Sequence, residues 1–264
     1  ANMKITLFTS NKSRHNYLIN LLSKFCDELF VVQECGTIHP GEVPGHYPAS
    51  KNMKNYFKEV YKAENKLFGN SFIKNYQKKI NILPILFGDL NKCSISFLSN
   101  FLKSDIYIVF GSSYIKGELV DFLVKKKTIN IHMGVSPYYR GTDCNFWALH
   151  DNNPHLVGAT IHMLTKGLDS GPILYHAMSK IKPNPFEYTM SAVKSAFHSI
   201  SERIVDSSIF DIEPIEQNKS QLIRYSKKDE FTENIVSEYL KKNINLNLTN
   251  FNNELLKDVY YLDL

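Results

Sequence analysis

The stretch Ile106–His132 (IYIVFGSSYIKGELVDFLVKKKTINIH) decides the fold class of this chain. Two short apolar runs, 106–110 and 128–132, flank a segment whose apolar residues recur at helical spacing over 119–124. This order predicts a strand, a helix and a second strand. That succession is the repeating unit of a parallel α/β sheet.

The same alternation extends in both directions along the chain. Apolar runs predict further strands at 4–9, 29–32, 83–87, 157–163 and 173–178. Helical spacing of apolar residues predicts helices from 17 to 25, from 53 to 61, over 95–102 and from 188 to 210, and the Gly- and Pro-containing stretch 36–47 predicts a loop. We therefore predict an α/β fold with a Rossmann-like, mostly parallel sheet.

Residues 211–264 contain a strand-like run at 221–225, a helical pattern near 230–240 and an Asn-rich tail. They are too few for a second ordinary domain. We predict a main domain over 1–210 and a small C-terminal extension over 211–264. The apolar residues of the extension favour a homodimer interface, and the alternative is that they cover the chain's own core: 221–225, Ile235, Tyr239, Leu240 and 260–262.

Composition excludes several classes of protein. With 43% hydrophobic and 22% charged residues in 264, the chain is neither disordered nor a rod. No run approaches the roughly 20 apolar residues of a membrane-spanning helix, which predicts a cytoplasmic protein without a membrane partner. The four cysteines lie far apart, so we expect no metal site. The basic residues behind the net charge of +5 are dispersed along the chain.

Two common ligand classes of parallel α/β proteins are disfavoured. The turn after the first predicted strand, 9–14 (TSNKSR), lacks the G-x-G-x-x-G pattern that lets a backbone approach a dinucleotide. No Walker A sequence occurs anywhere in the chain. The candidate site must therefore come from other residues.

Asn130, His132 and Asp169 form the most informative polar set. Asn130 and His132 are two residues apart at the end of a predicted strand, so their side chains point to the same side at the sheet edge where α/β proteins keep their sites. Asp169 lies in a turn flanked by Gly167 and Gly171. An amide, an imidazole and a carboxylate suit acyl chemistry, although a structural histidine and a turn-forming aspartate remain open alternatives.

The runs 130–132 (NIH), 137–141 (PYYRG), 158–162 (GATIH) and 169–171 (DSG) resemble, in order and spacing, the signature of the folate-dependent formyltransferases. The resemblance covers about 106–174 strongly. It implies that Asn130, His132 and Asp169 are catalytic and that N10-formyltetrahydrofolate is the formyl donor, with no metal. It also implies which residues line the pocket of that cofactor: Phe110, Gly111, Ser112, Ser113, Tyr114, Ile115, Lys166, Gly167 and Leu168. We interpret His162 as a supporting or core histidine.

The resemblance is nearest to the sugar N-formyltransferase branch, and within it to the GDP-perosamine N-formyltransferases of O-antigen synthesis. Methionyl-tRNA formyltransferases continue into a C-terminal barrel, glycinamide ribonucleotide formyltransferases have a glycine-rich phosphate loop, and formyltetrahydrofolate hydrolases have a domain ahead of the core; none of these is evident here. The expected partner is a nucleotide-linked amino sugar, not a nucleic acid. Candidate contacts are Lys12, Arg14 and Arg140 for its diphosphate and Tyr47, Tyr138 and Tyr139 for its base. The sequence does not identify the base or the position of the amine.

Overall fold

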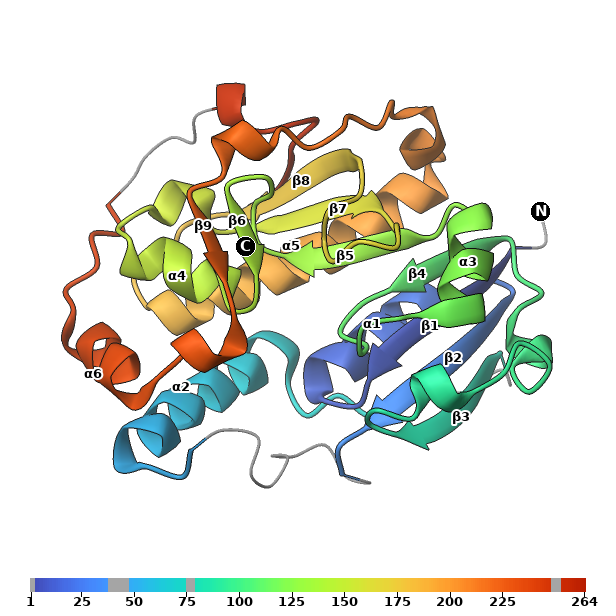
Figure 1. Cartoon of the computed structure of the whole chain (residues 1–264), viewed down its shortest axis with the longest axis horizontal. Coiled ribbons are helices and arrows are strands. Elements are labelled where there is room, and N and C mark those ends of the chain that lie inside the picture. Colours follow the sequence, from blue (N-terminus) through green and yellow to red (C-terminus); the bar gives the residue numbers. More distant parts are fainter. Residues whose placement is uncertain (1–2, 38–47, 75–78, 248–252) are drawn as a thin grey trace.

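The computed structural model describes residues 3–37, 48–74, 79–247 and 253–264 (Figure 1). The strands are β1 (Lys4–Ser10), β2 (Glu28–Cys35), β3 (Ile80–Leu86), β4 (Ile106–Val109), β5 (Ile129–Met133), β6 (Tyr139–Gly141), β7 (Ala159–Met163), β8 (Ile173–Ser179), β9 (Arg224–Ser226) and β10 (Tyr260–Leu262). The α-helices are α1 (Ser13–Ser23), α2 (Lys51–Phe68), α3 (Gly117–Lys125), α4 (Cys144–His150), α5 (Pro185–Val205) and α6 (Glu233–Lys241).

The described strands form one eight-stranded sheet in the order β10-β8-β7-β5-β4-β1-β2-β3, and β6 pairs with β9 in a separate ribbon. Neighbours in the large sheet run parallel, except that β7 is antiparallel to both β5 and β8. The prediction of a mostly parallel α/β sheet is confirmed. Because β7 and β8 are antiparallel, a short turn joins them, and this turn contains Asp169.

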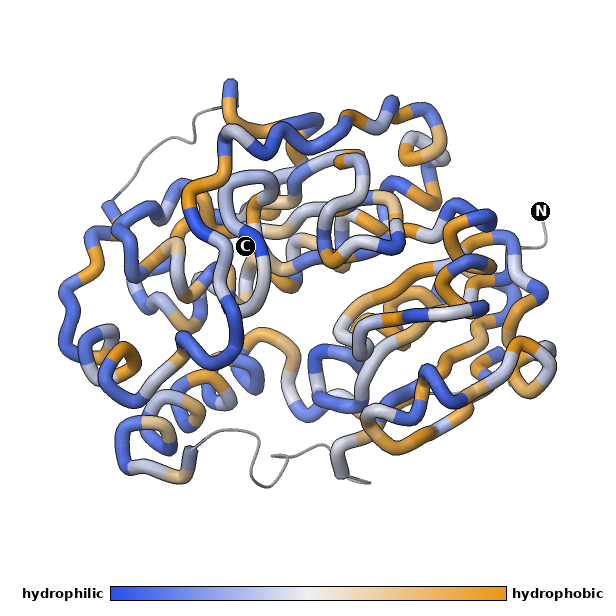
Figure 2. The backbone as a smooth tube through the Cα atoms, in the orientation of Figure 1, coloured by the Kyte–Doolittle hydropathy of each residue, from blue (hydrophilic) through white to orange (hydrophobic). Residues whose placement is uncertain are grey.

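Both faces of the sheet are buried along its central strands β1 and β4, which explains the near-continuous apolar runs there. Ile5 and Leu7 of β1 pack with residues of α1 and α5, whereas Phe8 packs on the other face with residues of α3. Figure 2 shows hydrophobic residues concentrated on the central strands, with hydrophilic residues on the outer segments. No helix within the described ranges is long and apolar enough to cross a membrane.

Two predicted helices differ from the structure. The pattern over 95–102 forms only a 3₁₀ turn, Ser99–Phe101. Serines near this segment compete with helix formation, since the Ser94 hydroxyl accepts the Phe97 N–H. The helix predicted to reach residue 210 ends at Val205 and is followed by a 3₁₀ turn, Ser208–Asp211. Most of the loop predicted at 36–47 lies outside the described residues.

The C-terminal extension shares the main sheet with residues 1–210. Its strand β10 pairs with β8, an edge position that the sequence did not indicate. Tyr239 is only 4% exposed and packs in the apolar cluster around Trp147, whereas Leu240 and Tyr261 are exposed. Several of the apolar residues considered for a dimer therefore cover the chain's own core, and the homodimer remains a prediction.

His176 of β8 fastens the C-terminal segment to the loop after β5. Its Nδ1 accepts the backbone N–H of Lys257 at 2.9 Å, so its Nε2 carries the proton that is donated to the Ser136 carbonyl at 2.7 Å. The contact with Lys257 requires a neutral ring, because a protonated Nδ1 cannot accept a hydrogen bond. Burial, against a smaller opposing effect of the Ser136 hydrogen bond, lowers the pKa of His176 to about 4.

We expect acid to destabilise the protein through His176. The unfolded imidazole binds a proton near pH 6.5 and the folded one only near pH 4, so this stabilisation is complete above pH 6.5 and is lost as the pH falls. The loss between pH 6.5 and 4 should be about 3 kcal/mol. Urea unfolding at several pH values should show a shallower acid dependence for His176→Gln than for the wild type. Equal pH dependence in the two proteins would contradict the assignment.

Candidate active site

A cavity of about 350 Å³ opens where β4 and β5 end. The segment after β4, the last residues of β5, the turn after β7 and the start of α1 all contribute to its wall. In a parallel sheet the carboxyl ends of adjacent strands meet at one edge, and ligands bind there. The structure brings Asn130, His132 and Asp169 together in this cavity.

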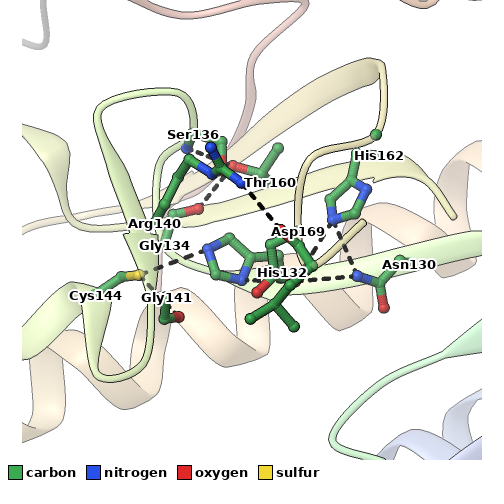
Figure 3. Close-up of polar contacts among 12 residues, drawn as sticks. Asn130, His132, Gly134, Ser136, Arg140, Gly141, Cys144, Thr160, His162 and Asp169 are labelled. Carbon is green, nitrogen blue, oxygen red and sulfur yellow. Dashed lines mark hydrogen bonds and ion pairs between the residues drawn. The ribbon is translucent and has the colours of Figure 1, made fainter. Parts of the chain in front are cut away.

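These three residues and His162 form a connected polar cluster (Figure 3). Asp169 Oδ1 lies 3.3 Å from His132 Nδ1 and 3.5 Å from Asn130 Nδ2. The Asn130 amide also lies 2.9 Å from His162 Nε2. Asn130 and His132 therefore point to the same side of β5, as their i, i+2 spacing predicted, and one oxygen of Asp169 faces both.

His162 was interpreted as a supporting residue, and its position explains how it supports the cluster. It lies directly opposite Asn130 in the antiparallel pairing of β5 with β7. The side chain is 1% exposed, and its Nδ1 donates to the Met163 carbonyl at 2.9 Å. Its Nε2 is then free of a proton in the neutral ring and accepts from Asn130. His162 thus fixes which way the Asn130 amide faces.

Asp169 reaches the cluster from a tight turn. Its φ of 49° is left-handed, a conformation that Asp tolerates better than most residues. Two residues later, a Cβ on Gly171 would stand 1.7 Å from the Met163 carbonyl oxygen. The close approach of this turn to β7 therefore needs a glycine, which gives the DSG sequence a structural reason.

His132 and Asp169 form a coupled pair. Burial alone lowers the pKa of His132, but the charge and hydrogen bond of Asp169, together with Cys144, outweigh this and raise it well above the usual value. Burial also opposes ionisation of Asp169, but the charge and hydrogen bond of His132 outweigh it and hold the pKa of that carboxyl well below its usual range. The pair is therefore an imidazolium facing a carboxylate at neutral pH.

Cys144 contacts the second nitrogen of the catalytic candidate His132. Its Sγ lies 3.6 Å from His132 Nε2 and 3.4 Å from the Gly141 carbonyl. From the sequence, the spacing of the cysteines argues only against a metal site. Nothing in the spacing of residues 132 and 144 predicts this contact, which arises because α4 begins beside the end of β5.

Most of the predicted cofactor-binding residues line the cavity: Phe110, Gly111, Ser112, Ser113, Tyr114, Ile115, Gly167 and Leu168. Lys166 is not among the lining residues, and its ammonium pairs with Asp121 at 3.0 Å. Its carbonyl accepts the Tyr114 hydroxyl, so the two predicted segments are joined at the rim.

Glu34, which the sequence did not single out, organises the segment after β4. Its carboxylate is 1% exposed and accepts the Ser113 N–H at 2.7 Å, the Ser113 hydroxyl at 2.9 and 2.8 Å, and the Gly88 N–H at 2.9 Å. A buried charge is stable when several donors surround it. The strand run ELFVVQEC gives no signal of this role, because the partners are more than 50 residues away.

The predicted diphosphate contacts have different positions. Arg14 lines the cavity, but its guanidinium is ion-paired with the buried Glu64. The Lys12 ammonium lies 5.0 Å from the Tyr61 ring, and Lys12 does not line the cavity. Arg140 donates to the Leu168 carbonyl at 3.2 Å. Arg14 is therefore the one of these three that reaches the cavity.

The prediction that a base stacks on Tyr138 or Tyr139 is not supported by their positions. Both rings are buried in the apolar cluster, at 6% and 1% exposed. Their hydroxyls are engaged with the Leu255 carbonyl and the Asp151 carboxylate. Burial makes both rings part of the core, although their place in a polar motif favoured ligand contacts. Tyr47 lies outside the described residues.

The fold and the polar cluster define an α/β protein with an Asn-His-Asp site at the carboxyl edge of its sheet. Residues 101–208 match the family described as Formyl transferase. The segment that contains the cluster is therefore similar to the formyltransferases.

Individual curated proteins show the same similarity. The chain is 30% identical to a methionyl-tRNA formyltransferase of Thermotoga maritima over 139 residues. The aligned residues make up 52% of this chain and 41% of that protein. The chain spans less than half the length of the curated relatives it matches.

Solved structures share the fold over most of the chain. A sugar N-formyltransferase from Shewanella sp FDAARGOS_354 aligns with a TM-score of 0.53 at 14% identity, covering 87% of this chain and 78% of the other. A 4-N formyltransferase from Francisella tularensis aligns with a TM-score of 0.50 at 21% identity over the same shares. The likeness thus extends beyond residues 101–208 at the level of fold.

Proposed function

We propose that this protein is an N-formyltransferase that moves a formyl group from N10-formyltetrahydrofolate to the amine of a nucleotide-linked amino deoxysugar. GDP-perosamine is the favoured acceptor, for synthesis of a surface polysaccharide such as O-antigen. The observation that carries the proposal is the joining of Asn130, His132 and Asp169 in one cavity with the segment 110–115. The proposal includes a cytoplasmic homodimer.

The chain's own residues can supply each need of the reaction. The neutral amine attacks the formyl carbon, and its carbonyl oxygen gains negative charge. Asn130 Nδ2 and the His132 imidazolium are the donors available to that oxygen. Their present contacts of 3.3 to 3.6 Å with Asp169 and Cys144 are long, so a bound carbonyl can compete for them.

Proton movement completes the exchange. As the new C–N bond forms, the amine loses one proton, and as the bond from the formyl carbon to N10 breaks, N10 gains one. Asp169, whose carboxylate is ionised, accepts the amine proton directly or through water, and the His132 pair returns a proton to the leaving nitrogen. The cavity also aligns the two substrates, which by itself can lower the barrier by about 7 kcal/mol or more.

The function is tested by mixing the purified protein with N10-formyltetrahydrofolate and following tetrahydrofolate formation. We expect consumption only when a nucleotide-linked amino sugar is added, with GDP-, dTDP- and UDP-linked amino sugars compared in parallel. Release of formate without an acceptor would instead identify a hydrolase. Formylation of methionyl-tRNA or glycinamide ribonucleotide would identify those activities. Sugar-nucleotide binding without any formyl transfer would leave a binding module.

Glu34→Gln should weaken use of the formyl donor. In the wild type the Ser113 N–H and hydroxyl donate to the Glu34 carboxylate. The neutral amide of the variant has only one accepting oxygen, so the segment around Ser113 is held less firmly. We expect the KM for the donor to rise roughly tenfold while kcat and the acceptor KM change little. Steady-state kinetics with each substrate varied in turn measure this.

The control is Glu28→Gln on the same strand. Glu28 is at the opposite end of β2, where it faces Lys4 and Asn81. It should leave all three constants near their wild-type values. An unchanged donor KM in Glu34→Gln would remove Glu34 from the donor site.

A further inference from the structure

The turn that contains Asp169 is held from outside the cavity by the C-terminal extension. Gln217 Nε2 donates to the carbonyls of Asp169 and Gly171, both at 2.9 Å. Gln217 belongs to the segment that runs from the end of α5 to β9 (Figure 1), and it lies outside the family-matched residues 101–208. One amide group thus bridges two carbonyls on either side of Ser170.

Other contacts fasten the same segment and the same turn. Just before Gln217, Ile215 exchanges two backbone hydrogen bonds with Ile173, at 2.7 and 2.9 Å, at the start of β8. Arg140 donates to the carbonyl of Leu168, the residue before Asp169. Side chains outside the cavity therefore donate hydrogen bonds to the carbonyls of the turn, while the Asp169 carboxylate faces His132.

The turn needs such support. Asp169 has a left-handed backbone that costs free energy in a residue with a Cβ, and such conformations persist only when surrounding contacts fix them. The Asp169 to His132 contact is 3.3 Å, so a small displacement of the turn would separate the pair. Gln217 does not line the cavity, and it can act on the reaction only through Asp169.

We propose that Gln217 is a positioning residue that holds the Asp169 carboxylate against His132. The kinetic part of this inference rests on the proposed formyl transfer. The structural part does not, because it concerns the distance between two side chains of the free protein. Both parts follow from one amide that donates to two carbonyls.

The sharpest readout is the titration of His132, followed by the NMR signal of its ring proton. The titratable groups that face this ring are Asp169, Cys144 and, at 6.3 Å between ring centroids, His162. Of these, only Asp169 is attached to the turn that Gln217 holds. When the carboxylate moves away, the imidazolium loses its main stabilising charge, and the pKa of His132 should fall by about one unit.

The test variant is Gln217→Met, which keeps the length of the side chain and removes both donors. The control is Gln221→Met, an exposed glutamine in the same segment. We expect Gln217→Met to lower the His132 pKa and to reduce kcat roughly tenfold with both KM values little changed. Gln221→Met should match the wild type in every measurement.

A His132 pKa unchanged in folded Gln217→Met would overturn the proposal. Where near-ultraviolet circular dichroism shows that this variant is unfolded, Gln217→Asn is used, because it keeps an amide that is too short to reach both carbonyls. It should give a smaller fall in the same pKa, and no fall would again overturn the proposal. A wild type without formyl transfer, combined with the expected pKa change, would reject the proposed function and keep the role of Gln217.

Discussion

Asp169→Asn should lower kcat on the order of a hundredfold or more, which corresponds to ~2.7 kcal/mol, and should change the KM of either substrate little. The substitution keeps the shape of the side chain but removes the charge that keeps His132 protonated. Burial then dominates, the pKa of His132 falls, and the ring is neutral where the oxyanion needs a cation. Steady-state kinetics with both substrates varied measure the loss.

His132→Asn should lose a similar factor. The double variant should lose much less than the product of the two single losses, because the residues act as one unit. The pH dependence has a defined sign. In the wild type kcat should begin to decline only when the pH is well above 6.5, where His132 loses its proton. In Asp169→Asn the decline should begin at a lower pH.

The matched control is Asp121→Asn, whose carboxylate is half exposed and pairs with Lys166. It removes an aspartate charge near the rim of the cavity without touching His132, and it should retain nearly all of the wild-type kcat. Near-normal kcat in Asp169→Asn itself would return Asp169 to the role of a turn-forming residue.

Gly141→Ala should strongly destabilise the protein and reduce its activity. Gly141 lines the cavity on β6, has a φ of 92°, and a Cβ there would stand 1.9 Å from the Ser226 carbonyl oxygen of β9. The strands β6 and β9 must then separate, and the hydrogen bonds between them are lost. Strain and separation together should cost about 3 kcal/mol or more, measured by urea unfolding.

Gly88→Ala separates these two effects. Gly88 has nearly the same φ, 94°, but a Cβ there meets nothing within 4 Å. It should show only the backbone strain, about 1 to 2 kcal/mol. Equal destabilisation in the two variants would mean that the contact between β6 and β9 contributes nothing.

The sequence by itself determined the layered fold and the central part of the site. Apolar runs alternating with helical spacing are local signals, and they indicated the strands of the parallel sheet, although β10 was missed. Asn130 and His132 could be paired because side-chain direction in a strand repeats every two residues. Asp169 was found through the glycines on either side and through resemblance.

Only the tertiary structure decided what surrounds these residues. His162 faces Asn130 through an antiparallel register, and Glu34 meets Ser113 across 79 positions of sequence. Gln217 reaches the Asp169 turn from the extension, 48 residues away. The prediction that Tyr139 contacts a base was wrong because its burial depends on residues of α4 and on Asp151, which the local motif does not show. Periodicity reports which way a side chain points, but its partners are set by the packing of distant segments, which leaves no local pattern.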